Sequence, residues 1–169
     1  MSYKYLISEQ YLKEETTLHE NVDSKIVGVA IRESQDIHTR DVLGSSLYDL
    51  IISELPSSLS AANKELVNNY IAPMQKYYSV KEIIISLQYK LANSAVLIRD
   101  VDNMRPVSVE DLELLEQKYE DKAEYYRKRL VDFLCDNSKD YPKYSESNQS
   151  IDPNTTSYNQ GTIFLNEIS

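Results

Sequence analysis

The feature that most constrains the fold is a long helical pattern towards the C-terminal end of the chain. Its apolar residues form one continuous stripe at helical spacing: Leu112, Leu115, Tyr119, Ala123, Tyr126, Leu130 and Leu134. Ser108 and Asp111 resemble a capping box at its start. A helix that ends near residue 136 is roughly 40 Å long at about 1.5 Å per residue. This is long for a chain of 169 residues, so we expect one end to protrude or to serve assembly.

Two further helical patterns follow one another between residues 22 and 55. Asn21 is the expected N-cap of the first helix, which spans 22–43. Its expected buried face is Ile26, Ala30, Ser34 and Ile37. Gly44 can adopt the left-handed backbone conformation that ends a helix with little strain, and a serine directly after it can cap the next helix. Pro56 terminates that short second helix, so the sequence predicts a helical corner.

The middle of the chain predicts two helices and a strand. The pattern over 65–77 is helical, but Pro73 lies inside it and predicts a kink or break near residue 72. Ser79 is the expected cap of a further helix over 80–93. The stretch AVLIRD at 95–100 is short and rich in β-branched residues, so we expect a strand there.

The two ends of the chain differ from its helical middle. Residues 3–7 alternate between apolar and polar as a short strand does, and 8–15 can form a helical turn or two. From residue 137 the composition shifts to Ser, Asn, Asp, Tyr and Pro, which predicts an extended polar tail. The tail ends in the strand-like segment GTIFLNEI (161–168), which either reaches a second surface or is a mobile end.

The predicted fold is therefore mainly α: a compact helical bundle with a long C-terminal helix, a small β element and an extended C-terminal tail. The predicted units are a helical domain over 1–136 and a tail over 137–169. Gly is scarce, at three residues, and this argues against an all-β fold rich in tight turns.

The composition indicates what the surface can bind. The chain has 14 Tyr, two Phe and no Trp. Tyr suits surfaces buried against other chains, although it also fills half-buried helix positions. The formal net charge is −9, and so acidic a chain is a poor nucleic-acid binder because phosphate contacts rely on Lys and Arg. It can still lie beside DNA without binding it.

The sequence gives no sign of secretion or membrane insertion. The stretch MSYKYLISEQYLKEETTL lacks the apolar core of a signal peptide, and the longest apolar runs are far shorter than a membrane span. The single Cys135 excludes an internal disulfide. We therefore expect a soluble protein made in a reducing compartment, with no membrane partner.

A search for chemistry finds no convincing motif. The three glycines stand apart, so there is no phosphate-binding loop. His19 and His38 lack the spacing of a metal site, and no histidine lies near Cys135 in sequence to activate it. Residues 100–103 faintly resemble a calcium loop but lack its glycine and distant glutamate. We expect no catalytic, cofactor-binding or metal-binding residue, and no enzyme.

The order of the parts is similar to that of a known family. The matching stretches, in chain order, are LISEQYL, NVD, LG, LYDLI, YIAP, LANS and a final helix with Tyr119, Glu124 and Tyr126. Over about residues 5–136 the chain resembles the head-to-tail connector (adaptor, head-completion) proteins of tailed phages, and it looks closest to the ring proteins of crAss-like phages. The individual motifs are short, so the match depends on their order.

The resemblance implies a structural role in the virion. Such proteins form a homo-oligomeric ring, usually of twelve copies, under the portal protein at the head–tail neck. The ring extends the channel through which double-stranded DNA passes and docks the next neck or tail protein. The subunit would be made in the host cytoplasm. The acidic balance fits this role, because an acidic channel wall repels phosphates.

Two other functions remain open on the sequence. One is a small cytoplasmic helical adaptor that binds a partner through its C-terminal tail. The other is an enzyme whose site has no sequence signature. Oligomeric state separates the ring from the adaptor, and a pocket with convergent titratable groups would indicate the enzyme.

Overall fold

The fold is mainly helical, as the sequence predicts. The computed structural model describes residues 3–92, 95–98 and 109–147. Its elements are α1 (Glu9–Glu14), α2 (Ser24–Ser34), the π-helical turn η1 (Gln35–Thr39), α3 (Arg40–Glu54), α4 (Ala61–Leu66), the π-helical turn η2 (Val67–Ile71), α5 (Ala72–Gln88), β1 (Tyr89–Ala92), β2 (Ala95–Ile98), α6 (Val109–Asp136) and α7 (Pro142–Ser147). Among these helices, none combines the length and apolar content that a bilayer crossing requires.

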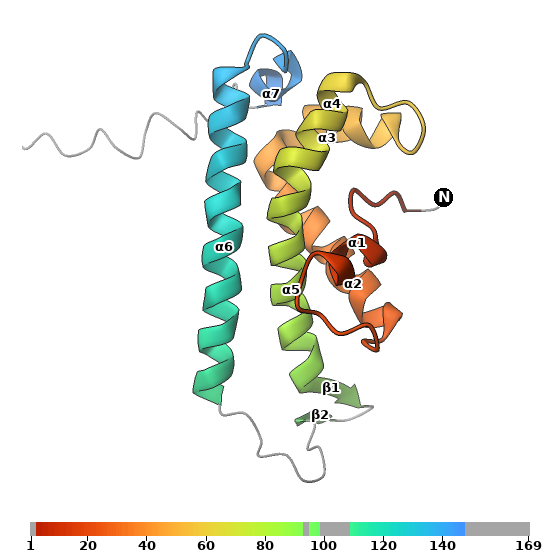
Figure 1. The fold of residues 1–169 in the computed structure, drawn as a ribbon, viewed down its shortest axis with the longest axis vertical. Coiled ribbons are helices and arrows are strands. Elements are labelled where there is room, and N and C mark those ends of the chain that lie inside the picture. Colours follow the sequence, from red (N-terminus) through yellow and green to blue (C-terminus); the bar gives the residue numbers. More distant parts are fainter. Residues whose placement is uncertain (1–2, 93–94, 99–108, 148–169) are drawn as a thin grey trace, which may run out of the picture.

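The antiparallel pair α5 and α6 forms the long axis of the molecule (Figure 1). The prediction of a long final helix is confirmed, since α6 has 28 residues and is about 42 Å long. Its apolar stripe is fully buried at Ala123, Leu130 and Leu134, whereas Leu115 is 40% exposed. The stripe is therefore covered in the C-terminal half of α6 and open near its N-terminal end.

The helical corner forms, but its first helix, α2, begins later than predicted. Asp23, not Asn21, is the N-cap of α2: its Oδ1 accepts a hydrogen bond from the Lys25 backbone N–H at 2.9 Å. The backbone N–H of Asn21 is bonded instead to His19 Nδ1 at 3.1 Å, inside the preceding turn. Capping by an acid adds a favourable interaction with the helix dipole, which explains why the aspartate takes this place.

Gly44 has the positive φ that the sequence predicts. Its φ is 70° and its ψ is 158°, which interrupts α3 with a kink. The helical backbone stops at Gly44 and resumes directly afterwards, so two helical segments of α3 meet at this residue, as the sequence predicts. The helix then ends at Glu54, two residues before Pro56, as predicted.

Of the kink or break predicted near Pro73, the break is wrong, because one helical path runs from Ala61 to Gln88. The π-helical turn η2 comes directly before the proline, and the Ala72 N–H donates to the Val67 carbonyl. Proline removes one backbone donor and crowds the preceding turn. A widened turn at this place relieves that crowding without ending the helix.

The predicted cap at Ser79 is also wrong, whereas the helix predicted over 80–93 is confirmed as far as Gln88, as the C-terminal part of α5. Ser79 is fully buried inside α5, and its hydroxyl donates to the Gln75 carbonyl at 2.9 Å. The helix ends at Gln88, where β1 begins and pairs antiparallel with β2. The strand predicted over 95–100 falls on β2 as far as Ile98, and its last two residues lie outside the described residues.

The folded body extends past the predicted boundary at residue 136. Tyr141 and Tyr144 are buried around α7, and the Tyr141 hydroxyl donates to the Ala62 carbonyl at 2.9 Å. The polar composition of this stretch gave no indication that two of its tyrosines are buried. The rest of the predicted tail, including 161–168, lies outside the described residues.

The predicted N-terminal strand is wrong, although α1 forms where one or two helical turns were expected. Residues 3–7 are irregular, because the Leu6 N–H donates to the side chain of Gln35 instead of to another strand.

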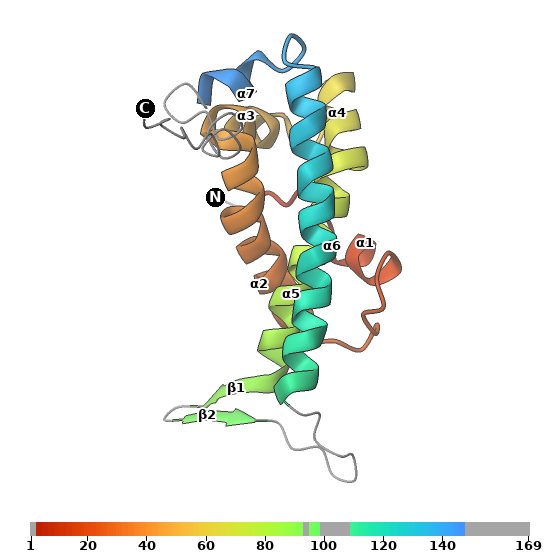
Figure 2. The same ribbon diagram turned by 90° about the vertical axis from the view of Figure 1, so that its left-hand side faces the viewer.

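The core has two parts on either side of α5. Buried residues of α3, α5, α6 and α7 form the larger part, and residues of α1, α2 and α5 form the smaller one. Accordingly, α6 and α2 pack on different sides of α5 (Figures 1 and 2). This arrangement places two separate helix surfaces on the outside of the molecule.

Candidate functional site: a groove beside α2 and two exposed apolar faces

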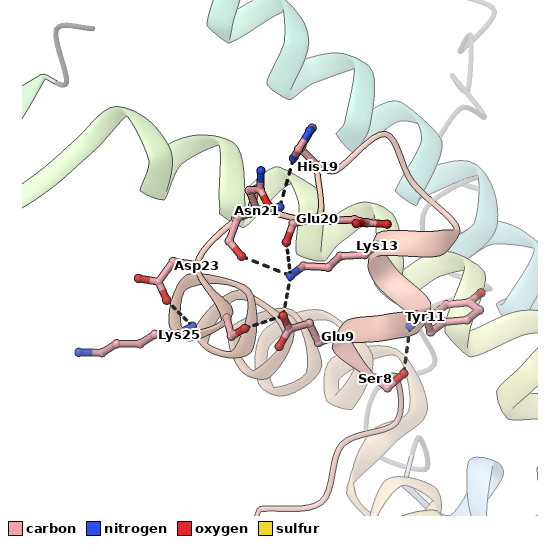
Figure 3. Close-up of polar contacts among 11 residues, drawn as sticks. Ser8, Glu9, Tyr11, Lys13, His19, Glu20, Asn21, Asp23 and Lys25 are labelled. Carbon is pink, nitrogen blue, oxygen red and sulfur yellow. Dashed lines mark hydrogen bonds and ion pairs between the residues drawn. The ribbon is translucent and has the colours of Figure 1, made fainter.

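A network of polar contacts fixes α1 against the start of α2 (Figure 3). The Ser8 hydroxyl caps α1. Lys13 Nζ lies 2.7 Å from Glu9 Oε1 and donates to the Glu20 carbonyl at 2.9 Å. The Ser24 hydroxyl also donates to Glu9, at 2.7 Å. The bonds from Lys13 and then Ser24 lower the pKa of Glu9, so the carboxylate stays charged and holds the two helices together.

Beside this network lies an open groove of about 790 Å³. It runs between residues 5–9, the helices α1 and α2, and the region where η2 joins α5. Its apolar lining is contributed by Leu6, Ile7, Tyr11, Ile31 and Ala72, and Ser8, Glu9 and Asn68 add polar groups. A mostly apolar groove with a few polar groups suits a peptide segment.

Gly28 lies in the same groove, in the middle of α2. A Cβ atom built there would meet nothing within 4 Å. A glycine inside a helix costs about 0.5–1 kcal/mol relative to alanine. Packing among the described residues therefore gives no reason for the glycine, whereas a close approach of another segment to the helix backbone would.

A buried hydrogen-bond network supports the wall of the groove. Gln35 is fully buried in η1, and its Oε1 accepts from the Leu6 N–H at 2.9 Å. Its Nε2 donates to the Lys4 carbonyl at 2.9 Å and to the Tyr48 hydroxyl at 3.0 Å. Gln75 of α5 adds a longer contact to the same Oε1 at 3.4 Å. One side chain thus connects the N-terminal segment, the helical corner and α5.

Two groups of large apolar side chains are exposed on different helices. Val29 of α2 and Ile37 of η1, which we call face A, are 46% and 58% exposed. Leu114 and Leu115 of α6, which we call face B, are 64% and 40% exposed. The prediction that Ile37 is buried is wrong, because the π-helical turn shifts the helical phase at this residue. Since α5 packs between α2 and α6, the two faces are distinct surfaces (Figure 1).

Tyrosines of α5 and α6 fill the seam between these helices. Tyr77 stacks on Tyr126 with ring centroids 5.5 Å apart. Lys122 Nζ lies 4.9 Å from the Tyr119 ring centroid, and the Arg129 guanidinium lies 5.7 Å from that of Tyr126. Cations of the protein itself thus lie over these ring faces, which argues against a stacking platform for nucleic-acid bases. These three tyrosines and two cations stabilise the contact between α5 and α6.

Tyr78 has one of the most perturbed pKa values among the described groups. Burial raises the pKa of its hydroxyl, and a very short hydrogen bond to Glu124 adds to the effect. The bond joins α5 to α6, which is a structural role.

The residues considered as candidates for catalysis or metal binding do not form a cluster. His19 lies in the turn before α2, and His38 of η1 stacks on Tyr78 with centroids 3.8 Å apart. Cys135 is exposed near the end of α6. Within the described residues there is no group of three His, Cys, Asp or Glu that could hold a metal ion. The calcium-loop candidate at 100–103 lies outside them.

The sequence alone did not indicate the groove or the position of Gly28 in its lining. The one available signal was a glycine inside the helical pattern of 22–43, where it lowers helix propensity.

Comparison with protein families gives one match. Residues 39–154 match a family described as "Family of unknown function (DUF6712)", and the match covers more than half of the chain. The chain belongs to this family. The DUF6712 match includes α3 to α7, whereas α1 and α2 lie before it, so the groove is built where the N-terminal segment packs on the DUF6712 part. No curated protein and no solved structure matches the chain.

Proposed function

We propose that the protein is a structural subunit of a phage virion. Copies of it form a closed ring at the neck between head and tail, for which the family resemblance suggests twelve copies. The ring binds the portal protein on one side and docks further neck or tail proteins on the other. Double-stranded DNA passes through the ring without specific binding.

The observation that carries the proposal is the presence of face A and face B on different helices. A two-fold dimer uses the same patch on both subunits, whereas a ring joins one patch to a different patch on the next copy. Two separate apolar faces, on α2–η1 and on α6, meet this requirement.

Two further features support a structural role. Most of the buried hydrogen bonds described above serve contacts within the fold, among them the Gln35 network and the α5–α6 contact. The net charge of −9 suits a channel wall along which DNA moves freely. The order of the sequence motifs gives the resemblance to connector proteins.

The experiment is a complementation test with two charged variants, Ile37→Asp on face A and Leu114→Asp on face B. Native mass spectrometry of the wild type should show closed oligomers. Each variant alone should be a monomer, because each lacks one half of every contact. A mixture of the two should give only a one-to-one dimer, joined by the intact face B of the first and the intact face A of the second.

The control is Leu50→Asp, which places the same charge at a 36% exposed leucine of α3 outside both faces. It should assemble as the wild type does. If Leu114→Asp alone still dimerises, the contact is two-fold and the ring is refuted. A wild type that stays monomeric, with and without the portal protein, would favour the cytoplasmic adaptor instead. In a filter assay at physiological salt, the ring should not retain duplex DNA.

A further inference from the structure

We infer that the groove beside α2 binds the C-terminal segment 161–168 of the neighbouring copy in the ring. This inference rests on the proposed function, since it requires copies side by side. It assigns the groove an occupant with a known sequence, GTIFLNEI.

Gly28 provides the first argument. It weakens α2, it has no strained backbone conformation, and a side chain at this position would meet only open space. Such a glycine is explained when another backbone comes close to the helix, because a side chain would then be in the way. The groove thus has the form of a site that is filled in the assembly.

The chemistry of the groove provides the second argument. Tyr5, which is 45% exposed, and the partly exposed Tyr11 provide most of the accessible apolar surface, because Leu6, Ile7, Ile31 and Ala72 form a nearly buried floor. Ser8 and Asn68 add polar groups at the edge. Segment 161–168 contains the consecutive apolar residues Ile163, Phe164 and Leu165, followed by polar ones. A short apolar segment is not stable alone in water and needs a surface to bind.

The position of the groove and the length of the chain provide the third argument. Val29, the residue after Gly28 on α2, belongs to face A, so the groove lies next to the surface that meets the neighbouring copy. The described chain ends at Ser147. Roughly 16 peptide units at about 3.3 Å each span up to about 50 Å before Ile163, which exceeds the length of α6. A tail can therefore reach across from one copy to the next.

The test uses the full chain with the photoreactive amino acid p-benzoylphenylalanine in place of Phe164. Equal amounts of ¹⁵N-labelled and unlabelled protein are assembled, irradiated, digested and analysed by mass spectrometry. We expect crosslinks from position 164 to residues 5–11, 28–31 or 68–72. About half of them should join differently labelled chains, because a ring assembled from equal amounts of the two proteins has random neighbours.

Two variants test the groove and the segment separately. Gly28→Leu fills the groove and should reduce the crosslinks at least tenfold, while the control Asp49→Leu, at an exposed position of α3 outside the groove and outside both faces, should leave them unchanged. Leu165→Asp alters only the segment and should reduce the crosslinks without affecting the folded body. Circular dichroism confirms that each variant is folded.

The outcomes separate this inference from the proposed function. Oligomers that form normally, but crosslink elsewhere or do not respond to Gly28→Leu, would refute the groove and leave the ring intact. Crosslinks to the groove that join only identically labelled chains would refute the neighbouring copy as the source. Absence of oligomers would refute the ring, and this inference with it.

Discussion

The same substitution should have opposite effects at two glycines of the helical corner. Gly44 has a φ of 70° and a ψ of 158°, a combination that is essentially restricted to glycine. Gly28 lies inside α2 with no positive φ and with open space around its Cα. Alanine at position 44 is therefore strained, whereas alanine at position 28 only improves helix propensity.

The structure sets the size of both effects. A non-glycine residue in the backbone conformation of Gly44 costs about 1–3 kcal/mol, so Gly44→Ala should lose about 2 kcal/mol of unfolding free energy. Gly28→Ala should gain about 0.5–1 kcal/mol. The two variants should thus differ by about 3 kcal/mol, although each adds one methyl group.

Urea unfolding followed by circular dichroism measures the difference, at a protein concentration low enough to keep the chain monomeric. With a slope of about 2 kcal/mol per molar urea, the two midpoints should lie about 1.5 M apart. A loss below about 0.5 kcal/mol for Gly44→Ala would refute the strained conformation. A clear loss of unfolding free energy for Gly28→Ala would mean that the subunit itself requires this glycine. Gly28 would then no longer support the inference that another segment binds in the groove.

Three further predictions concern the network, α7 and the α5–α6 contact. Gln35→Leu should cost about 2–4 kcal/mol in urea unfolding, because it breaks two buried hydrogen bonds and one partly buried hydrogen bond, while the exposed Gln10→Leu should cost under about 0.5 kcal/mol. Tyr141→Phe should cost about 1 kcal/mol by losing the bond to the Ala62 carbonyl, and no loss would mean that α7 is not anchored there. The pKa of Tyr78 is raised in the folded state, so its contribution is complete below the ordinary value of about 10 and is lost as pH rises through the raised value. The wild type should therefore lose more stability between pH 8 and pH 11 than Tyr78→Phe does.

The sequence predicted those parts of the fold that local chemistry determines. The long helix α6 follows from its repeated apolar stripe, and the kink at Gly44 follows from a glycine between two apolar patterns. The end of α3 before Pro56 follows from the missing backbone donor of proline. Each of these signals acts within a few residues of its place in the chain.

Tertiary contacts determine the parts that the sequence did not predict. Ser79 has the chemistry of a helix cap, but it pairs with the Ser34 hydroxyl at 2.7 Å across two helices. Tyr141 anchors a polar stretch through a partner almost 80 residues away in the chain. The groove arises between segments that only the fold brings together, so no single stretch of sequence could indicate it.

The spacing of the buried residues accounts for the two π-helical turns, together with Pro73 in the case of η2. Buried residues recur every four positions along the first helical path, at Val27, Ile31, Gln35, Thr39 and Leu43, and along the second, at Asn63, Val67, Ile71, Gln75, Ser79 and Ile83. On a straight α-helix, a step of four residues turns about 40° too far, so four such steps would carry the pattern roughly 160° around the helix. One π-helical turn in each path widens the helix and returns the pattern to the core. The same phase correction brings Gln35 opposite Gln75 and turns Ile37 outward, so the spacing of buried residues sets both the wall of the groove and the apolar face beside it.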